Sequence, residues 1–245
     1  AVVFNCISFL LILFIITRFN YLASINTTMH YNNIEIELTT ACTLGCPGCP
    51  RNYQKHLKGQ WNTGHMSLDS VKWIAKNTDF NQYLFVGCYG DPIYHPDIVQ
   101  ILDFYAWLGK RVSIETNASN TKKEIWDTIN EELDLHTFIW TFSVDGLEDT
   151  NHIYRKRSNW SHIEYAMSKI LSMPKERRPS TVWKWIEFPY NKHQTLEARA
   201  LAKSIGFDEF ASVTSTRWRP YPKSTEDIEQ YLFPKELELW KGKYV

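Results

Sequence analysis

The stretch NIEIELTTACTLGCPGCPRNY, residues 33–53, decides the fold class because a strand pattern runs directly into a cysteine-rich loop. Apolar residues alternate with two glutamates from Ile34 to Leu38, and this period of two is typical of a β-strand. Three of the five cysteines of the chain then occupy one glycine-containing loop: Cys42, Cys46 and Cys49. The stretch therefore predicts a first strand with a soft-metal or redox site at its carboxyl end.

The same strand-then-helix pattern continues along the chain. Strand-like runs recur at 83–88, 111–116, 136–143, 180–188 and 209–218. Helical spacing lies between them at 67–77, 96–109, 121–133, 159–173 and 193–206. Strands that alternate with helices indicate an α/β fold with a parallel sheet. We predict a partial (β/α)6 TIM-like barrel with parallel strands, although an open doubly wound sheet gives nearly the same pattern.

Composition narrows the class of protein. The chain has 245 residues, which suffices for one large domain, and 44% hydrophobic with 22% charged residues is typical of a globular protein. Its formal net charge of zero gives no electrostatic case for a nucleic-acid or acidic-membrane partner. An odd number of unevenly spaced cysteines does not indicate a secreted disulfide framework.

The first 28 residues form a separate question. Residues 1–28 contain a strongly apolar run that is short for a membrane span of about 20 residues and lacks the basic start of a secretory signal. This leader is interpreted as upstream sequence before a true start at Met29, as a membrane anchor, or as an apolar helix of the domain. The domain itself is predicted to cover 29–245, with a membrane role only if the leader is native.

Polar residues follow every predicted strand. Active sites of parallel α/β folds collect beyond the carboxyl ends of the strands. The second strand leads to Tyr89–Pro92, the third to Glu115 and Asn117, and the fourth to Ser143. Four arginines that could bind a carboxylate or phosphate also follow strands: Arg155, Arg157, Arg217 and Arg219. The sequence thus predicts one active-site face.

The count of three cysteines in the loop separates two kinds of metal site. A structural zinc ion normally takes four protein ligands, which would make the chain a zinc-stabilised binding module. Three thiolates instead leave one iron of a [4Fe–4S] cluster without a protein ligand. A non-catalytic or electron-transfer iron–sulfur protein is a further alternative.

Cys42-x3-Cys46-x2-Cys49 directly after a first strand resembles the signature of the radical S-adenosylmethionine (radical SAM) superfamily, and the resemblance extends from residue 33 to about 219. It implies an enzyme with one [4Fe–4S] cluster on the three cysteines. The cluster would reductively cleave S-adenosylmethionine (SAM) to a 5′-deoxyadenosyl radical that abstracts hydrogen from an unknown substrate. It also implies a flavodoxin- or ferredoxin-like electron donor and a cytoplasmic location.

The resemblance also implies where SAM binds. Tyr89, Gly90, Asp91 and Pro92 are similar to the Gly-Gly-Glu-Pro motif of the family, whose backbone receives the methionine amino group. Asn117 and Ser143 match positions that commonly contact the SAM carboxylate or ribose, and Glu115 is a further candidate for a polar contact.

Two features bear on how this chain fits the family. Pro47 and Gly48 replace an aromatic that many members place near the adenine, so we expect Tyr53 or an apolar residue after the fifth predicted strand to contact adenine. Cys88 is interpreted as a small buried apolar residue. The sequence has no cysteine after Cys88, which indicates a single-cluster core domain.

Overall fold

A computed structural model describes residues 3–4, 32–58, 61–119 and 122–214. Its strands form one sheet in which every neighbouring pair is parallel. In chain order they are β1 (Val3–Phe4), β2 (Asn33–Ile36), β3 (Gln82–Phe85), β4 (Val112–Thr116), β5 (Ile139–Ser143), β6 (Ser180–Ile186) and β7 (Glu209–Val213). The six predicted strands are all present, and β1 adds a two-residue strand inside the segment interpreted as a leader.

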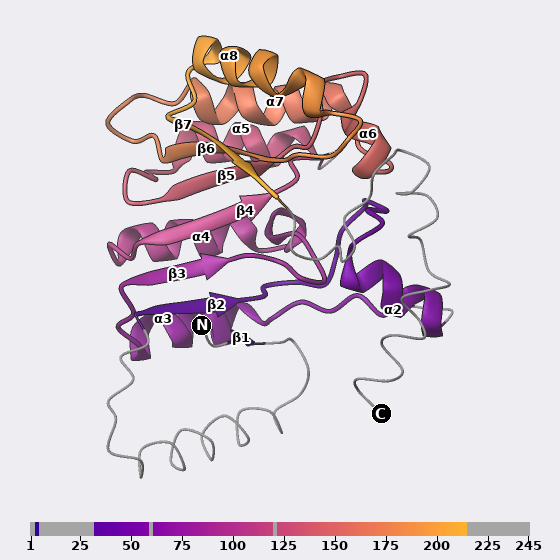
Figure 1. The fold of residues 1–245 in the computed structure, drawn as a ribbon. Helices are drawn as coiled ribbons and strands as arrows, with labels where there is room; N and C mark the ends of the chain where they lie inside the picture. Colours follow the sequence, from indigo (N-terminus) through magenta and orange to yellow (C-terminus); the bar gives the residue numbers. More distant parts are fainter. Residues whose placement is uncertain (1–2, 5–31, 59–60, 120–121, 215–245) are drawn as a thin grey trace, which may run out of the picture.

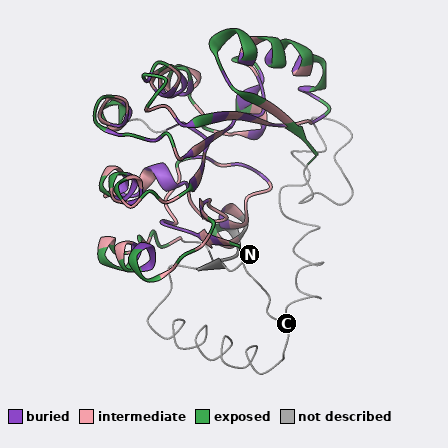
Figure 2. Ribbon diagram, turned by 90° about the vertical axis from the view of Figure 1, so that its left-hand side faces the viewer, coloured by how far each residue is buried: buried purple, intermediate pink, exposed green. Residues whose placement is uncertain are grey.

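The order of the strands decides between the two predicted architectures. A doubly wound sheet reverses its strand order at a switch point and carries helices on both faces. Here the order runs from β1 to β7 without reversal among the described strands. Figures 1 and 2 show the main helices along one face of a curving sheet. The predicted partial TIM-like barrel is therefore confirmed.

The helices fall into two groups. Five of them follow strands and cover the outer face of the sheet: α3 (Leu68–Asn77), α4 (Ile98–Trp107), α5 (Lys123–Glu132), α7 (Trp160–Leu171) and α8 (Thr195–Ile205). The shorter ones lie in loops at the carboxyl ends of strands: α2 (Pro50–Lys58), α6 (Asn151–Tyr154), η1 (Pro92–Tyr94) and η2 (Lys192–Gln194). Sequence periodicity predicts the first group and misses the second, whose helices are very short or, in the case of α2, mostly polar.

Local signals set the ends of the long helices. Ser67 caps α3, because its hydroxyl accepts a hydrogen bond from the Ser70 backbone N–H at 3.2 Å. α8 ends at Gly206, whose φ of 100° is left-handed and suits glycine at a helix terminus. These two residues coincide with ends of the helical ranges that the sequence predicts, 67–77 and 193–206.

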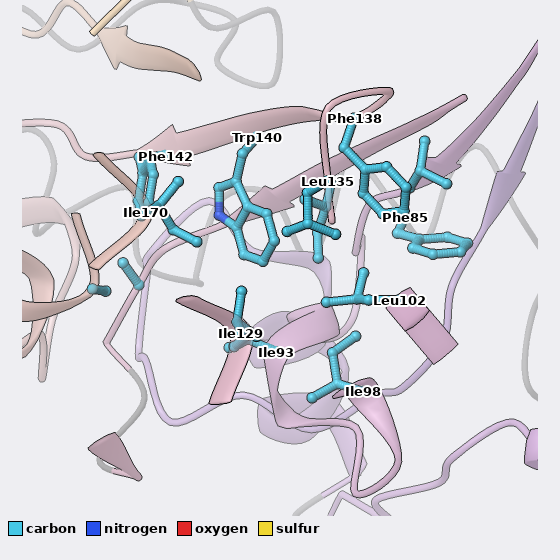
Figure 3. Close-up of a cluster of buried hydrophobic side chains, with 14 of the residues drawn as sticks. Phe85, Ile93, Ile98, Leu102, Ile129, Leu135, Phe138, Trp140, Phe142 and Ile170 are labelled. Atoms are coloured by element: carbon cyan, nitrogen blue, oxygen red, sulfur yellow. The ribbon is translucent and has the colours of Figure 1, made fainter. Parts of the chain in front are cut away.

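The hydrophobic core lies between the sheet and its helices. Trp140 and Phe142 of β5 are fully buried there, as are Trp183 and Trp185 of β6. Figure 3 shows the aromatic side chains of β5 facing isoleucines and leucines of the outer helices and loops. Because side chains alternate along a strand, the residues between these aromatics point to the opposite, inner face.

The register brings polar residues together on that inner face. Ser143 of β5 lies beside Lys184 of β6, and Glu115 of β4 lies beside Thr141 of β5. Residues in register on neighbouring parallel strands share a face. The inner face of the barrel is therefore polar near the carboxyl ends of its strands.

Parts of the sequence interpretation lie outside the described residues. They include most of the leader, the segment from Thr216 to Arg219, and the end of the predicted domain up to residue 245. No helix in the described ranges is long and apolar enough to cross a membrane. The leader therefore stays a prediction.

Candidate active site

A cavity of about 380 Å³ opens at the carboxyl ends of the strands. Eight of the ten residues predicted for the site line it: Cys42, Cys46, Cys49, Gly90, Asp91, Glu115, Asn117 and Ser143. The other two, Tyr89 and Pro92, flank the lining residues of the same loop. Loops from four strands thus meet at one cavity, as the strand-end argument predicts.

The cysteine loop presents three free thiols to this cavity. Cys49 donates its backbone N–H to the Cys46 carbonyl at 3.2 Å, and Asn52 of α2 donates its side-chain amide to the same carbonyl at 2.9 Å. Burial raises the pKa of the Cys42 thiol to about 11 and that of Cys46 to about 12. Both thiols are therefore protonated at neutral pH, and a metal group must displace those protons to bind.

The loop after β3, residues 87–92, is fastened to the cysteine loop. Asp91 donates its backbone N–H to the Ala41 carbonyl at 2.8 Å. Gly90 packs so closely that an added Cβ would lie 1.9 Å from the Thr39 carbonyl oxygen. Only glycine fits this approach, so the two loops that resemble family motifs form one rigid unit.

A buried glutamate holds the other side of this loop. Glu37 accepts the backbone N–H groups of Tyr89 and Gly90 on a single carboxylate oxygen, the latter at 3.0 Å. Its side chain is almost fully buried, and burial raises its pKa despite these hydrogen bonds. From the sequence, Glu37 is only a polar residue of the first predicted strand, and its contact with this loop is not predicted.

The Asp91 carboxylate is occupied by hydrogen bonds from other residues of the chain. It accepts hydrogen bonds from the Ile93 N–H at 3.2 Å, the Thr116 hydroxyl at 3.0 Å and the Asn117 N–H at 2.7 Å. Burial raises its pKa to about 6 although these donors favour the charged form. Because its oxygens are occupied, the side chain of Asp91 ties β3 to β4 and leaves backbone atoms of its loop to face a ligand.

Asn117 connects β4 to the cysteine loop. Its side-chain amide lies 3.6 Å from the Cys42 sulfur and also donates to the Asp91 carboxylate. The left-handed residue of this turn is Ala118, with a φ of 60°, while Asn117 caps it by accepting the Ser119 N–H at 3.0 Å. The turn thus positions Asn117, but the residue with the left-handed backbone is Ala118 and not Asn117.

Glu115, Ser143 and Lys184 form a charged group on the inner face. Lys184 contacts both Glu115 oxygens at 2.8 and 3.0 Å, and the Ser143 hydroxyl donates to one of them at 2.5 Å. Burial opposes ionisation, but the Lys184 ammonium and the Ser143 hydroxyl hold the pKa of Glu115 below its usual range. Sequence analysis misses Lys184, although a lysine within the apolar run of β6 is the signal that could have identified it.

Two arginines add positive charge beside the thiols. Arg155 pairs with the fully buried Asp145 at 2.6 Å, and Asp145 also accepts the Ile186 N–H at 2.7 Å. Arg51 of α2 turns inward and donates to the Leu44 carbonyl. Both guanidinium groups line the cavity and would offset the charge of thiolates there.

The structure shows where some of the other residues named in the sequence analysis lie, but not all of them. Arg157 lies exposed outside the cavity, and Cys88 is half-buried and lines it rather than being fully buried. Ile186, the last residue of β6, is an apolar lining residue, although it lies within the fifth predicted strand rather than after it. The Tyr53 side chain and both Arg217 and Arg219 lie outside the described residues.

The donor set fits a cluster with three protein ligands. Three thiols share one cavity with inward-facing arginines and a glycine-braced loop. Thiolates are the usual ligands of iron–sulfur clusters, and nearby hydrogen bonds and charge tune their reduction potential. In the part of the chain that the structure describes, no three His, Cys, Asp or Glu side chains are grouped to hold a single metal ion.

Comparison with known proteins agrees with this geometry. The sequence model of the Radical SAM superfamily matches residues 36–232. No curated protein matches the chain.

Three solved structures share the fold. SuiB of Streptococcus suis bound to S-adenosylmethionine has a TM-score of 0.62 at 14% identity, over 91% of this chain and 51% of SuiB. SuiB bound to the precursor peptide SuiA gives 0.60 at 15%, over 92% and 50%. Native anSMEcpe with bound AdoMet gives 0.52 at 14%, over 87% and 63%. The chain therefore spans about half the length of SuiB.

Proposed function

Because the chain belongs to the radical SAM superfamily, we propose that it is an enzyme that holds one [4Fe–4S] cluster on Cys42, Cys46 and Cys49. The family implies both this cluster and SAM as cofactors, and radical SAM chemistry as the type of reaction. Residues 29–245 are proposed as the radical SAM domain. The observation that carries the proposal is the convergence of the three thiols and the loop at 87–92 on one cavity.

The cofactors supply the bond-breaking chemistry. When bound, the reduced cluster provides an electron for cleavage of SAM, and the resulting 5′-deoxyadenosyl radical abstracts hydrogen from a substrate. The protein residues bind and orient these groups and exclude water from them. The following assignments concern those residues.

Cys42, Cys46 and Cys49 act as thiolate ligands. The Asn117 amide near the Cys42 sulfur donates toward a metal-bound thiolate, and such N–H···S contacts tune cluster potential. Arg155, held in place by Asp145, supplies a fixed positive charge beside the loop. The Asn117 amide and the positive charge of Arg155 would both favour reduction of the cluster.

SAM is proposed to bind across the strand ends. The backbone of Tyr89–Pro92 receives its amino group, since the Asp91 side chain is occupied by protein donors. Glu115 and Ser143 contact its ribose or carboxylate, and Lys184 adds a cation on the same wall. The charged wall thus matches a ligand with both signs of charge.

The adenine is proposed to pack on Ile186. This side chain lines the cavity and its backbone is fixed by Asp145. An aliphatic contact would serve where Pro47 and Gly48 leave no aromatic.

Anaerobic reconstitution tests the proposal. We expect about four irons per chain and 5′-deoxyadenosine after reduction with SAM. The Cys46→Ala variant should lose both. Unchanged SAM cleavage in that variant, or stoichiometric zinc in active protein, would refute the assignment.

Electron paramagnetic resonance separates an enzyme from an electron-transfer protein. SAM that binds the open iron changes the spectrum of the reduced cluster. An electron carrier with the same cluster would show no change when SAM is added.

A further inference from the structure

The two segments that flank the cysteine loop are unusually basic for a chain of zero net charge. Residues 50–58 include α2, and residues 154–158 follow α6. Together they carry six cations and no Asp or Glu: Arg51, Lys55, Lys58, Arg155, Lys156 and Arg157. The asymmetry is local, because Lys+Arg and Asp+Glu are both 27 over the whole chain.

These cations divide into an inner and an outer set. Arg51 and Arg155 turn inward onto the Leu44 carbonyl and Asp145, as described above. Lys55 and Arg157 are exposed and Lys156 is half-exposed. Within the described ranges no ion pair joins these outer three to a carboxylate. The inner set lines the cavity, while the outer set lies at the surface without an ion-pair partner among the described residues.

Two members of the outer set, Lys156 and Arg157, lie beside the cysteine loop. Gly45 donates its backbone N–H to the Lys156 carbonyl at 2.8 Å. A Cβ on Gly45 would lie 3.6 Å from the Lys156 Cβ and 3.9 Å from the Arg157 Nε. Because Gly45 is bonded to Cys46, the Arg157 side chain approaches the loop one residue from a proposed cluster ligand.

The backbone at Arg157 adds a second observation. Its φ of 71° is left-handed, a conformation that glycine or asparagine adopts more easily than arginine. Strained backbone of this kind occurs preferentially at functional sites. The left-handed residue thus stands where the chain passes the cysteine loop.

We propose that the outer basic surface beside the cysteine loop, defined by Lys156 and Arg157, is the docking site of a small acidic electron-transfer protein. This proposal rests on the proposed function, because it requires a cluster on the neighbouring cysteines. Complementary charge steers an encounter and fixes its orientation. A carrier docked here would place its redox centre beside the loop that carries the proposed cluster ligands.

The electron count of the transfer is simple. The flavin hydroquinone of the carrier loses one electron and one proton and becomes the neutral semiquinone. The oxidised cluster gains that electron, and the proton passes to solvent. No bond to the enzyme forms or breaks.

Stopped-flow reduction of the reconstituted enzyme tests the proposal, with a purified acidic flavodoxin in its hydroquinone form as the probe. We expect the bimolecular rate of cluster reduction to fall steeply from roughly 20 mM to roughly 500 mM salt, the range over which screening becomes strong. The double variant Lys156→Glu/Arg157→Glu should reduce the low-salt rate by at least about tenfold and flatten its salt dependence. Dithionite, a small reductant that needs no docking surface, should reduce both proteins equally.

Two further variants control for net charge and for folding. Lys175→Glu/Lys203→Glu makes the same change in charge at exposed positions near the amino ends of β6 and β7, and its rate should match wild type. Arg157→Gly removes the cation and relieves the left-handed backbone, so it should fold at least as well and still lose several-fold in rate.

The outcomes separate the two proposals. If dithionite-reduced wild type fails to cleave SAM, the proposed function is wrong. If it cleaves SAM but the charge reversal leaves the flavodoxin rate and its salt dependence unchanged, the docking proposal alone is overturned. Equal losses in the control pair would also overturn it, because the effect would then follow from net charge rather than from this surface.

Discussion

Glu37 is expected to govern SAM binding without touching SAM. Its single carboxylate oxygen accepts the backbone N–H groups of Tyr89 and Gly90 and so sets the direction of the loop proposed to receive the SAM amino group. Glu37→Ala removes this acceptor. Glu37→Gln keeps an oxygen at the same place, because the side-chain amide can accept both hydrogen bonds.

The magnitudes follow from these two contacts. Leaving a buried donor unsatisfied costs about 1–3 kcal/mol, so two of them in Glu37→Ala amount to about 2–6 kcal/mol. Glu37→Gln loses only the charge assistance and is expected to cost about 1 kcal/mol. If the loop relaxes instead of the whole fold, the alanine variant should bind SAM at least tenfold more weakly, or about 1.4 kcal/mol.

Calorimetric titration of SAM into the reconstituted protein and urea unfolding measure these effects. pH adds an independent readout, because burial raises the pKa of Glu37. At pH values between the pKa of Glu37 in the unfolded chain and its higher pKa in the folded protein, Glu37 loses its proton in the unfolded chain but stays protonated in the folded protein. Stability should therefore fall as pH rises from about 4 through the folded pKa. Glu37→Gln should lack this component of the fall.

Equal SAM affinity in wild type, Glu37→Gln and Glu37→Ala would show that the loop keeps its direction without the carboxylate. A glutamine variant as impaired as the alanine variant would show that charge, not the acceptor position, matters.

Three other substitutions test separate contacts. Gly90→Ala should abolish SAM binding and lower the yield of folded protein, because its Cβ would overlap a neighbouring carbonyl; Gly45→Ala, whose Cβ meets only ordinary contacts, is the matched control for binding and yield. Lys184→Met leaves Glu115 without its cation, so the pKa of Glu115 should rise, which titration by NMR in the cluster-free protein can follow, and SAM affinity should drop about tenfold. Arg155→Met leaves Asp145 as an unpaired buried charge and should cost about 3–5 kcal/mol in urea unfolding; no loss would mean that the pair contributes nothing.

The sequence predicts the strands and the residues at their ends because both depend on local order. Period-two alternation identifies β2, and the cysteine spacing directly after it identifies the proposed ligands. The sequential strand order also follows from right-handed β/α units once the alternative doubly wound order is excluded.

Long-range contacts explain what the sequence does not reveal. Glu37 meets Tyr89 across 52 positions, and Lys184 meets Glu115 across 69. Glu37 resembles a solvent-facing strand residue because the inner face of a partial barrel has the same alternation as an exposed face. Helix α2 is missed because its sequence is mostly polar and its start at Pro50 is its main signal.

The backbone hydrogen bond and close packing that join the loops after β2 and β3 bear on one property of the cavity and not on another. The proposed cofactor positions depend on glycine contacts, buried carboxylates and backbone hydrogen bonds, which tolerate little change. Cavity shape also depends on Val86 and Val213, whose aliphatic side chains make no hydrogen bonds and to which no cofactor contact is assigned. Their size can therefore vary without disturbing the proposed cofactor positions, so these two wall positions are where an engineered library could alter which substrates fit.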